Sequence, residues 1–191
     1  MFELPTSVKV GERTLSIRNN GDYRVIIDCM TALDDYELSD SERVYASLIV
    51  FYEDLNSLED VAGVDIEEAV KQMFWFINCG KPESPTRDAV KLIDWEQDEQ
   101  LISSAINKVV GKELRLEPYV HWWTFMGYYS SVGESTLSLV VGIRYKKHKG
   151  KTLEKYEQTF FLENPEYFTW QKKTRQQAEA EDLLAQIWNT Q

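Results

Sequence analysis

Apolar residues along this 191-residue chain recur mainly at the three- and four-residue spacing typical of helices. The widest apolar arc lies in residues 118–133, where Pro118 suits a first helical position and Gly133 suits the residue just past a helix end. Four large side chains fall at i, i+3, i+4 and i+7: Trp122, Phe125, Met126 and Tyr129. Because a buried aromatic side chain removes about 150–250 Å² from water, we expect this helix to anchor the core.

The start of the chain has a different period. Apolar and polar residues alternate on both sides of Gly11, a pattern that predicts a short β-hairpin carrying Val8, Val10, Leu15 and Ile17 on one face. Two strands alone are marginally stable in water. We therefore expect the hairpin to pack against the helices that follow.

Capping signals place the helices of the first half. Tyr23 begins the first of them, and Ser39 with Glu42 forms a capping box ahead of the second. Residues 55–63 predict only a short turn of helix, and Asp65 caps a third long helix that ends near Gly80.

The second half predicts four helices in addition to the aromatic one at 118–133. One ends at Gly111, one opens at Glu134 or Ser135, one starts at Thr152, and the last follows Pro165. Tyr145–Lys151 is expected to be a solvated loop between helices. The last helix has a polar middle and an apolar end, so that end requires a partner or a fold-back.

These elements predict a mainly α fold: a single helical domain of about seven or eight helices with an N-terminal β-hairpin. Residues 80–87 hold two of the five prolines and form the best candidate for an internal linker. We divide the chain into the hairpin and acidic helices (1–80), a linker (81–93) and an aromatic-rich helical half (94–191). We expect the three parts to form one globular unit.

The charge is strongly negative and uneven. The formal net charge is −11; residues 1–100 carry 22 acidic and 9 basic side chains, whereas residues 101–191 carry 10 and 12. This balance argues against nucleic acid and anionic membranes as partners. The asymmetry favours a homo-oligomer held by complementary charge, or else reflects two solvated faces.

The two cysteines, Cys29 and Cys79, lie in apolar surroundings and form no CxxC pair, so we interpret both as small buried hydrophobes. No basic and apolar leader follows Met1, and no apolar run approaches the roughly 20 residues that a membrane span needs. We expect a soluble, cytoplasmic protein.

Signatures of known chemistry are missing from the sequence. We find no phosphate-binding glycine loop, HExxH, GxSxG or zinc-spaced cysteines. His121 is expected to be a ring at the core margin, and Asp65, Glu67 and Glu68 to be favourable charges in a first helical turn rather than metal ligands. We therefore predict no enzyme activity, no cofactor and no metal; an enzyme that uses carboxylates alone is a distant alternative.

The candidate partner-binding residues are of two kinds. The basic run could form an electropositive knob that docks on an acidic surface, and the apolar end of the last helix needs a cover. The candidates are Arg144, Lys146, Lys147, Lys149 and Lys151 in the basic run, and Leu184, Ile187 and Trp188 near the C-terminus.

Most of the chain resembles the bacteriophage Gp15 family of tailed phages and prophages in Gram-positive bacteria. The resemblance is carried by the hairpin followed by Tyr23-Arg24, by His121-Trp122-Trp123, by Gly142-Ile143-Arg144 and by the lysine-rich segment 149–155. Residues 174–191 lie outside it.

The resemblance implies a phage morphogenesis protein encoded near the tape-measure gene, and a tail assembly chaperone that binds the tape-measure protein or tail subunits in the host cytosol. Two other functions stay open. One is a minor structural protein that remains in the virion, and the other is an acidic inhibitor that mimics nucleic acid.

Overall fold

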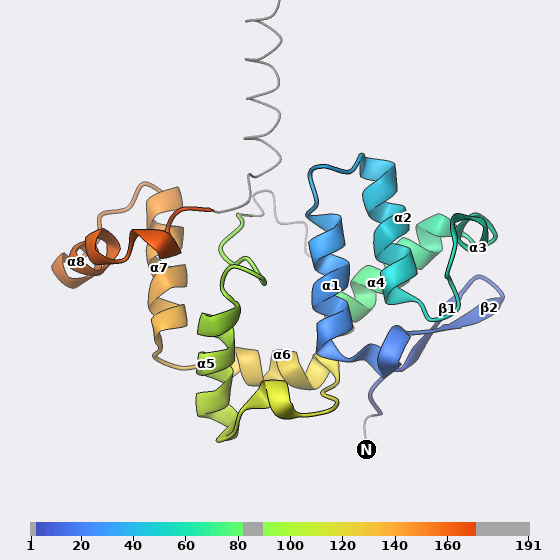
Figure 1. Ribbon diagram of the computed structural model, residues 1–191, viewed down its shortest axis with the longest axis horizontal. Coiled ribbons are helices and arrows are strands. Elements are labelled where there is room, and N and C mark those ends of the chain that lie inside the picture. Colours follow the sequence, from blue (N-terminus) through green and yellow to red (C-terminus); the bar gives the residue numbers. More distant parts are fainter. Residues whose placement is uncertain (1–2, 82–89, 171–191) are drawn as a thin grey trace, which may run out of the picture.

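The computed structural model describes residues 3–81 and 90–170, which form a two-stranded hairpin and eight α-helices (Figure 1). This confirms the predicted mainly α fold with an N-terminal hairpin. The elements are β1 (Ser7–Val10), β2 (Arg13–Ser16), α1 (Tyr23–Leu33), α2 (Asp40–Phe51), α3 (Leu58–Ala62), α4 (Ile66–Ile77), α5 (Glu99–Val110), α6 (Trp122–Ser130), α7 (Thr136–His148) and α8 (Lys155–Glu163). Short 3₁₀ turns span Arg18–Gly21, Leu114–Leu116 and Pro165–Tyr167.

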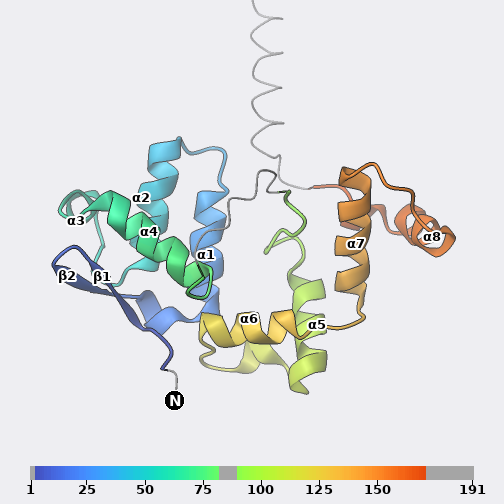
Figure 2. The same ribbon diagram turned by 180° about the vertical axis from the view of Figure 1, so that it is seen from behind.

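The elements form two groups. The hairpin and α1 to α4 lie on one side, α5, α7 and α8 lie on the other, and α6 runs across the base from α5 to the start of α1 (Figures 1 and 2). No helix within 3–81 or 90–170 is long and apolar enough to cross a membrane.

The hairpin forms as predicted, with β1 and β2 antiparallel and Val8 opposite Leu15. Gly11, at the turn, has φ of +58°, a conformation that glycine adopts without strain. Arg18, just after the hairpin, donates to the carbonyl oxygens of Ile49 (2.9 Å) and Tyr52 (2.9 Å) at the end of α2. Because these carbonyls lack partners within the helix, the guanidinium both caps α2 and fixes the hairpin to it.

The core of the N-terminal half is mainly apolar. α1, α2 and α4 contribute side chains with no exposed area: Ile26, Cys29, Leu48, Phe51, Ala69, Met73 and Phe76. The predicted caps are present, since Ser39 and Glu42 form the capping box of α2 and Asp65 accepts the Glu68 N–H at the start of α4. Local capping therefore sets where these helices begin, and their apolar stripes explain how they pack together.

The aromatic helix is shorter than predicted. α6 begins at Trp122 instead of Pro118, because Val120 is extended and pairs with the start of α1. The Val120 N–H donates to Asp22 Oδ2 (2.9 Å), and its carbonyl accepts the Tyr23 N–H (2.9 Å). The helix ends at Ser130, so Gly133 does not cap it. These bonds between distant segments replace the first predicted turn.

α6 contacts both halves through its rings. The indole N–H of Trp122 donates to the Ile77 carbonyl (2.9 Å), and Phe125 stacks on Tyr23 with a centroid distance of 4.6 Å. Trp122 and Phe125 are almost fully buried, whereas Tyr119 is 46% exposed. α6 therefore joins the two halves, but it does not supply most of the core.

The C-terminal half departs further from the predictions. Gly111 ends α5 with φ of +74°, and Ser135 caps α7, both as expected. However, α7 continues to His148, so most of the predicted basic loop is helical. α8 starts three residues after Thr152, and only a 3₁₀ turn follows Pro165 within the described residues.

Two predicted features fall largely outside the described residues. Most of the candidate linker and the apolar end of the predicted last helix, including Leu184, Ile187 and Trp188, are not among them.

Candidate interaction surfaces

His121 is a structural residue. Its side chain is buried at the N-terminus of α6, where Nδ1 accepts the Trp123 N–H (3.1 Å). Nε2 lies 2.9 Å from the Pro5 carbonyl, so Nε2 carries the proton and donates it to this oxygen. Burial lowers the pKa of His121, although the hydrogen bond to Pro5 opposes that shift. The ring is therefore neutral, and both nitrogens are occupied by the fold.

The two thiols are held in their protonated form by burial. Burial raises the pKa of Cys29 to about 12, and it also raises the pKa of the half-buried Cys79. A thiol that stays protonated is a poor nucleophile and a poor metal ligand. No group of three or more His, Cys, Asp or Glu residues within 3–81 and 90–170 could hold a metal ion.

The acidic start of α4 follows the predicted pattern. Asp65 caps the helix, and Glu67 and Glu68 lie in its first turn, where negative charge interacts favourably with the helix dipole. Glu68 also accepts from Lys71 (3.2 Å) and Gln72 (2.7 Å), and these bonds lower its pKa. These carboxylates stabilise the helix.

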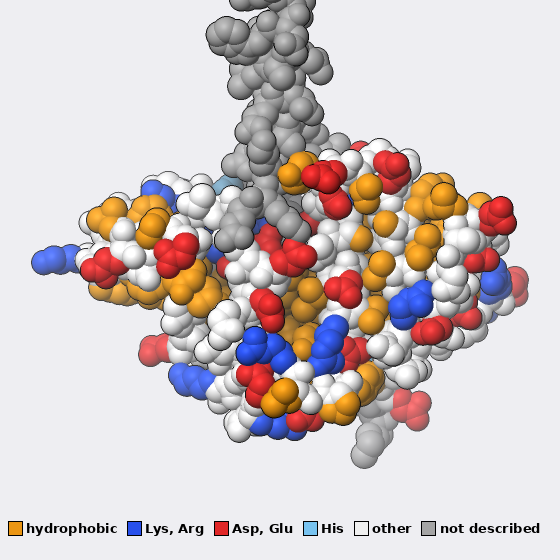
Figure 3. Space-filling view, in the orientation of Figure 1, with side chains coloured by type: hydrophobic (Ala, Val, Ile, Leu, Met, Phe, Trp, Pro, Cys, Tyr) orange, Lys and Arg blue, Asp and Glu red, His pale blue; other side chains and the backbone are white. Residues whose placement is uncertain are grey.

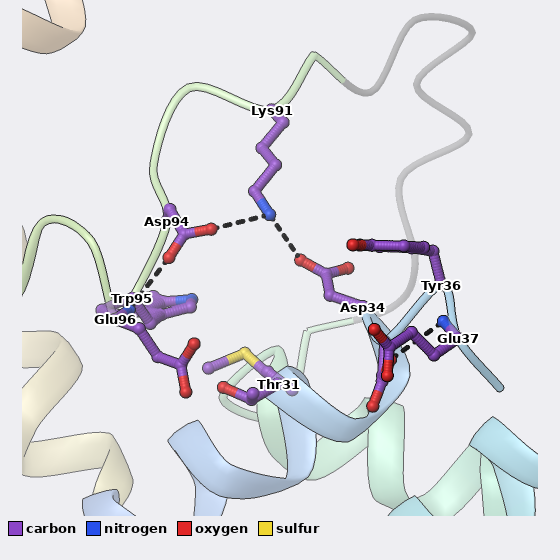
Figure 4. A pocket seen from close by; sticks show the side chains of 10 residues that line it. Thr31, Asp34, Tyr36, Glu37, Lys91, Asp94, Trp95 and Glu96 are labelled. Carbon is purple, nitrogen blue, oxygen red and sulfur yellow. Dashed lines mark hydrogen bonds and ion pairs between the residues drawn. The ribbon is translucent and has the colours of Figure 1, made fainter. Parts of the chain in front are cut away.

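A polar pocket of about 200 Å³ lies between the end of α1 and the segment before α5 (Figure 4). Lys91 reaches across it, with Nζ 3.0 Å from Asp34 Oδ2 and 3.0 Å from Asp94 Oδ2. Burial opposes its protonation, but the hydrogen bonds to both carboxylates outweigh burial and raise the pKa of Lys91. The chain thus supplies its own cation here, and that cation ties the two halves together.

Arg144, the first predicted partner-binding residue, is not on the surface. Only 7% of the residue is exposed, and its Nη2 binds Asp98 Oδ1 at 2.9 Å. It also donates to the carbonyls of Leu92 (2.9 Å) and Tyr167 (2.9 Å), and it stacks over the Trp170 ring at 4.3 Å. Four separate segments meet at this one guanidinium, so we correct its predicted role: Arg144 holds the C-terminal half together.

The four lysines predicted to bind a partner differ in their exposure and contacts. Lys146 binds the buried Glu157 at 2.7 Å, and this hydrogen bond raises the pKa of Lys146. Lys147 is exposed and lies 4.6 Å from the Phe161 ring centroid, and Lys151 is exposed beside Tyr145. Lys149 is exposed at the end of α7. Three of the five predicted basic residues are therefore exposed, and one of them, Lys147, lies beside α8.

We call the apolar side chains of α8 that reach solvent, Tyr156, Phe160 and Leu162, the α8 surface. Tyr156 and Phe160 share one side of the helix, whereas Leu162, two residues after Phe160, lies on the other side. Tyr156 is 63% exposed and Leu162 is 76% exposed, although both are large and apolar, and Phe160 is half-buried. A shallow groove of about 650 Å³ runs past Tyr156, Thr159 and Phe160. Figure 3 shows apolar side chains gathered at this end of the molecule. The sequence places Tyr156 and Phe160 on the helix stripe, but α7 and the segment with Tyr167 and Phe168 cover only part of the nine-residue helix.

A second apolar groove, of about 620 Å³, runs along the outer side of α4. We call its lining the α4 surface: Glu67, Val70, Lys71, Gln72, Phe74, Trp75 and Lys81. The apolar residues of α4 differ in burial: Met73 is buried, Val70 and Phe74 are half-buried, and Trp75 is 37% exposed. α4 is apolar around more of its circumference than one packing contact covers.

Comparison with known proteins identifies the chain. Residues 3–163 match the family model described as Bacteriophage Gp15 protein. The chain belongs to the bacteriophage Gp15 protein family. Membership of this family indicates a role in the structure or morphogenesis of a bacteriophage. Searches of curated proteins and of solved structures returned no match.

Proposed function

We propose that this protein is a non-enzymatic tail assembly chaperone that binds the tape-measure protein or tail subunits before they polymerise. The observation that carries the proposal is the α8 surface, where Tyr156 and Leu162 are largely exposed beside lysines on a protein of a phage family. Tyr156 lines one groove with Phe160, and such an exposed apolar groove favours contact with another protein.

The construction of α8 explains why its outer side is available. The inner side is held by Glu157, which is 4% exposed and paired with Lys146. This pair holds the inner side of α8, and Phe160 stacks on Tyr167, so Tyr156 and Leu162 are the side chains left largely exposed. Burial of apolar area stabilises a complex by roughly 25 cal/mol per Å², so Tyr156 and Leu162 can contribute without cost to the fold.

The chemistry of the client follows from the neighbours. Lys147, Lys149 and Lys151 are exposed, and Lys147 lies beside Phe161 of α8. They favour an amphipathic helix with acidic residues next to its apolar stripe. The chaperone would shield such helices from aggregation and leave them when the tail tube grows.

Co-expression with the neighbouring tape-measure product tests the proposal. We expect the tape-measure product to remain soluble and to co-elute with this protein on sizing. The double variant Tyr156→Ala/Leu162→Ala should lose the complex. The control Leu58→Ala/Leu116→Ala removes two leucines that are 64% and 81% exposed elsewhere, and it should keep the complex. A tape-measure product that is equally soluble alone, with no complex on sizing, would refute the proposal.

A minor tail protein that remains in the virion would also suit the family. Mass spectrometry of purified virions separates the two functions, since a chaperone should be absent from them. An acidic nucleic-acid mimic is less well supported, because Asp and Glu are interspersed with Lys, Arg and apolar side chains on the face in Figure 3.

A further inference from the structure

The α4 surface lies on the N-terminal half, and its side chains combine apolar contact area with an ordered pattern of charge. Val70 and Phe74 line the groove, and Trp75 stands beside them, 5.6 Å from the Trp123 ring. Glu67 lies at the start of the groove, and Lys81 lies beyond the end of α4. The groove therefore has a negative end, an apolar middle and a positive end.

This order is self-complementary under a two-fold rotation. When two copies of α4 pack antiparallel with Phe74 opposite Phe74, Glu67 in the first turn of each copy lies toward the C-terminal end of the other α4, the end that Lys81 follows. Val70 then faces the last turn of the other α4, and Trp75 comes close to Lys71 of the other copy, a cation and a ring that attract each other. A two-fold interface requires this property, since the same patch contributes both sides.

The distribution of charge along the chain also favours a second copy of this chain as the partner of the α4 surface. Residues 1–100 carry 22 acidic and 9 basic side chains, so two copies repel each other over most of this half. The α4 surface is an exception, because it holds Lys71 and Lys81 against the single carboxylate of Glu67. Lys71 is partly neutralised by Glu68 within its own copy. Two acidic chains can meet here without bringing like charges together.

We propose that the α4 surface binds a second copy of this chain, forming an antiparallel two-fold dimer centred on Phe74. This inference goes beyond the proposed function: it concerns a different half of the molecule, and it is tested on the purified full chain with no client. Failure of one proposal therefore leaves the other standing.

Sedimentation equilibrium over a range of concentrations tests the dimer. The wild type should approach twice the 22.3 kDa of the chain. Each charge reversal, Glu67→Lys or Lys81→Glu, places like charges together at both symmetric ends, so the dissociation constant should rise about tenfold or more. The double variant Glu67→Lys/Lys81→Glu restores opposite charges at both ends and should recover most of the affinity. Trp75→Ala should weaken the dimer by a similar factor, because it removes a large ring near the centre.

Glu59→Lys and Lys9→Glu are matched controls, since they change the net charge equally at exposed positions outside the groove. Both should keep the wild-type dissociation constant. A wild type that stays monomeric at every concentration, or a mass beyond the dimer, would overturn the proposal. So would a double variant no better than either single reversal, or controls that weaken the dimer as much.

Discussion

The two halves of this molecule are stabilised by different means. In residues 3–81 the centre is apolar, and Ile26, Leu48 and Phe76 have no exposed area. In residues 90–170 a buried ion pair, Asp98 and Arg144, occupies the junction of α5 and α7 with the segments around Leu92 and Tyr167. An apolar core tolerates small changes of shape, whereas a buried ion pair loses most of its value when either partner is lost.

This difference between the halves also explains where apolar side chains are exposed at the surface. The N-terminal half encloses its apolar residues between α1, α2 and α4 and leaves one outer groove. The C-terminal lobe has fewer helices to cover its rings, so Tyr156 and Leu162 remain exposed. Because the Asp98–Arg144 ion pair helps to hold the C-terminal half together, this half can expose apolar side chains to a partner and still remain folded.

The largest expected effect tests the ion pair. Arg144→Met leaves the Asp98 carboxylate buried with no cation, and we expect a loss of about 3–5 kcal/mol in the free energy of unfolding. Urea denaturation measures the loss. Hydrogen exchange should show that α5 and α7 lose protection while α1 and α2 keep it.

Asp98→Asn provides the matching variant. If Asp98 and Arg144 act as one unit, the double variant should lose less than the sum of the two single losses. Additive losses would mean that Asp98 and Arg144 do not act as one unit. Equal loss of protection in α2 would mean that the halves are not stabilised separately.

The next effect tests the contact between the halves. Gly21 has φ of +77°, and a Cβ there would lie 2.6 Å from Phe76 Cζ and 3.3 Å from His121 Nε2. In Gly21→Ala the backbone is strained, and the new Cβ clashes with Phe76 of α4 and with His121 at the start of α6. The free energy of unfolding should therefore fall by about 2–4 kcal/mol. Thermal and urea unfolding measure this cost.

Gly11→Ala is the control for Gly21→Ala. Gly11 has φ of +58°, but a Cβ at this position would meet nothing within 4 Å, so the variant should lose only the backbone contribution of about 1–2 kcal/mol. Equal losses at the two sites would show that the packing around Gly21 is loose.

The smallest effect is a pH dependence at His121. Its folded pKa is lowered by burial, so the neutral ring stabilises the fold above the ordinary value near 6.5. This stability is lost as the pH falls from there through the lowered pKa, because the unfolded chain binds the proton more readily. Stability of the wild type, measured by urea unfolding between pH 8 and 5, should decline accordingly.

His121→Asn should remove the histidine part of this decline. Asparagine can still accept the Trp123 N–H as a cap, but it leaves the Pro5 carbonyl without its donor, so we expect a loss of about 1–2 kcal/mol at pH 8. An unchanged pH slope in the variant would show that carboxylates, and not His121, set it.

The sequence predicts the features that depend on neighbouring residues. The capping box of Ser39 and Glu42 and the caps at Asp65 and Ser135 join residues three apart, so their patterns are visible in the chain itself. The hairpin at Gly11 is predictable for the same reason.

Features that depend on distant residues are not predictable in this way. The start of α6 is set by Asp22, which lies 98 residues before Val120, and Arg144 is buried by a partner 46 residues away. A basic run therefore resembles an exposed loop. The two apolar grooves are also missed, because the stripes of α4 and α8 are visible in the sequence but the number of helices available to cover them is not.

The bond between Pro5 and His121 has a consequence for synthesis on the ribosome. The two residues are 116 positions apart, and a ribosome adds roughly 5–20 residues per second. The segment before β1 must therefore wait on the order of ten seconds for the His121 ring that binds it. During that interval the underside of the nascent N-terminal half is open, and the arrival of α6 closes it.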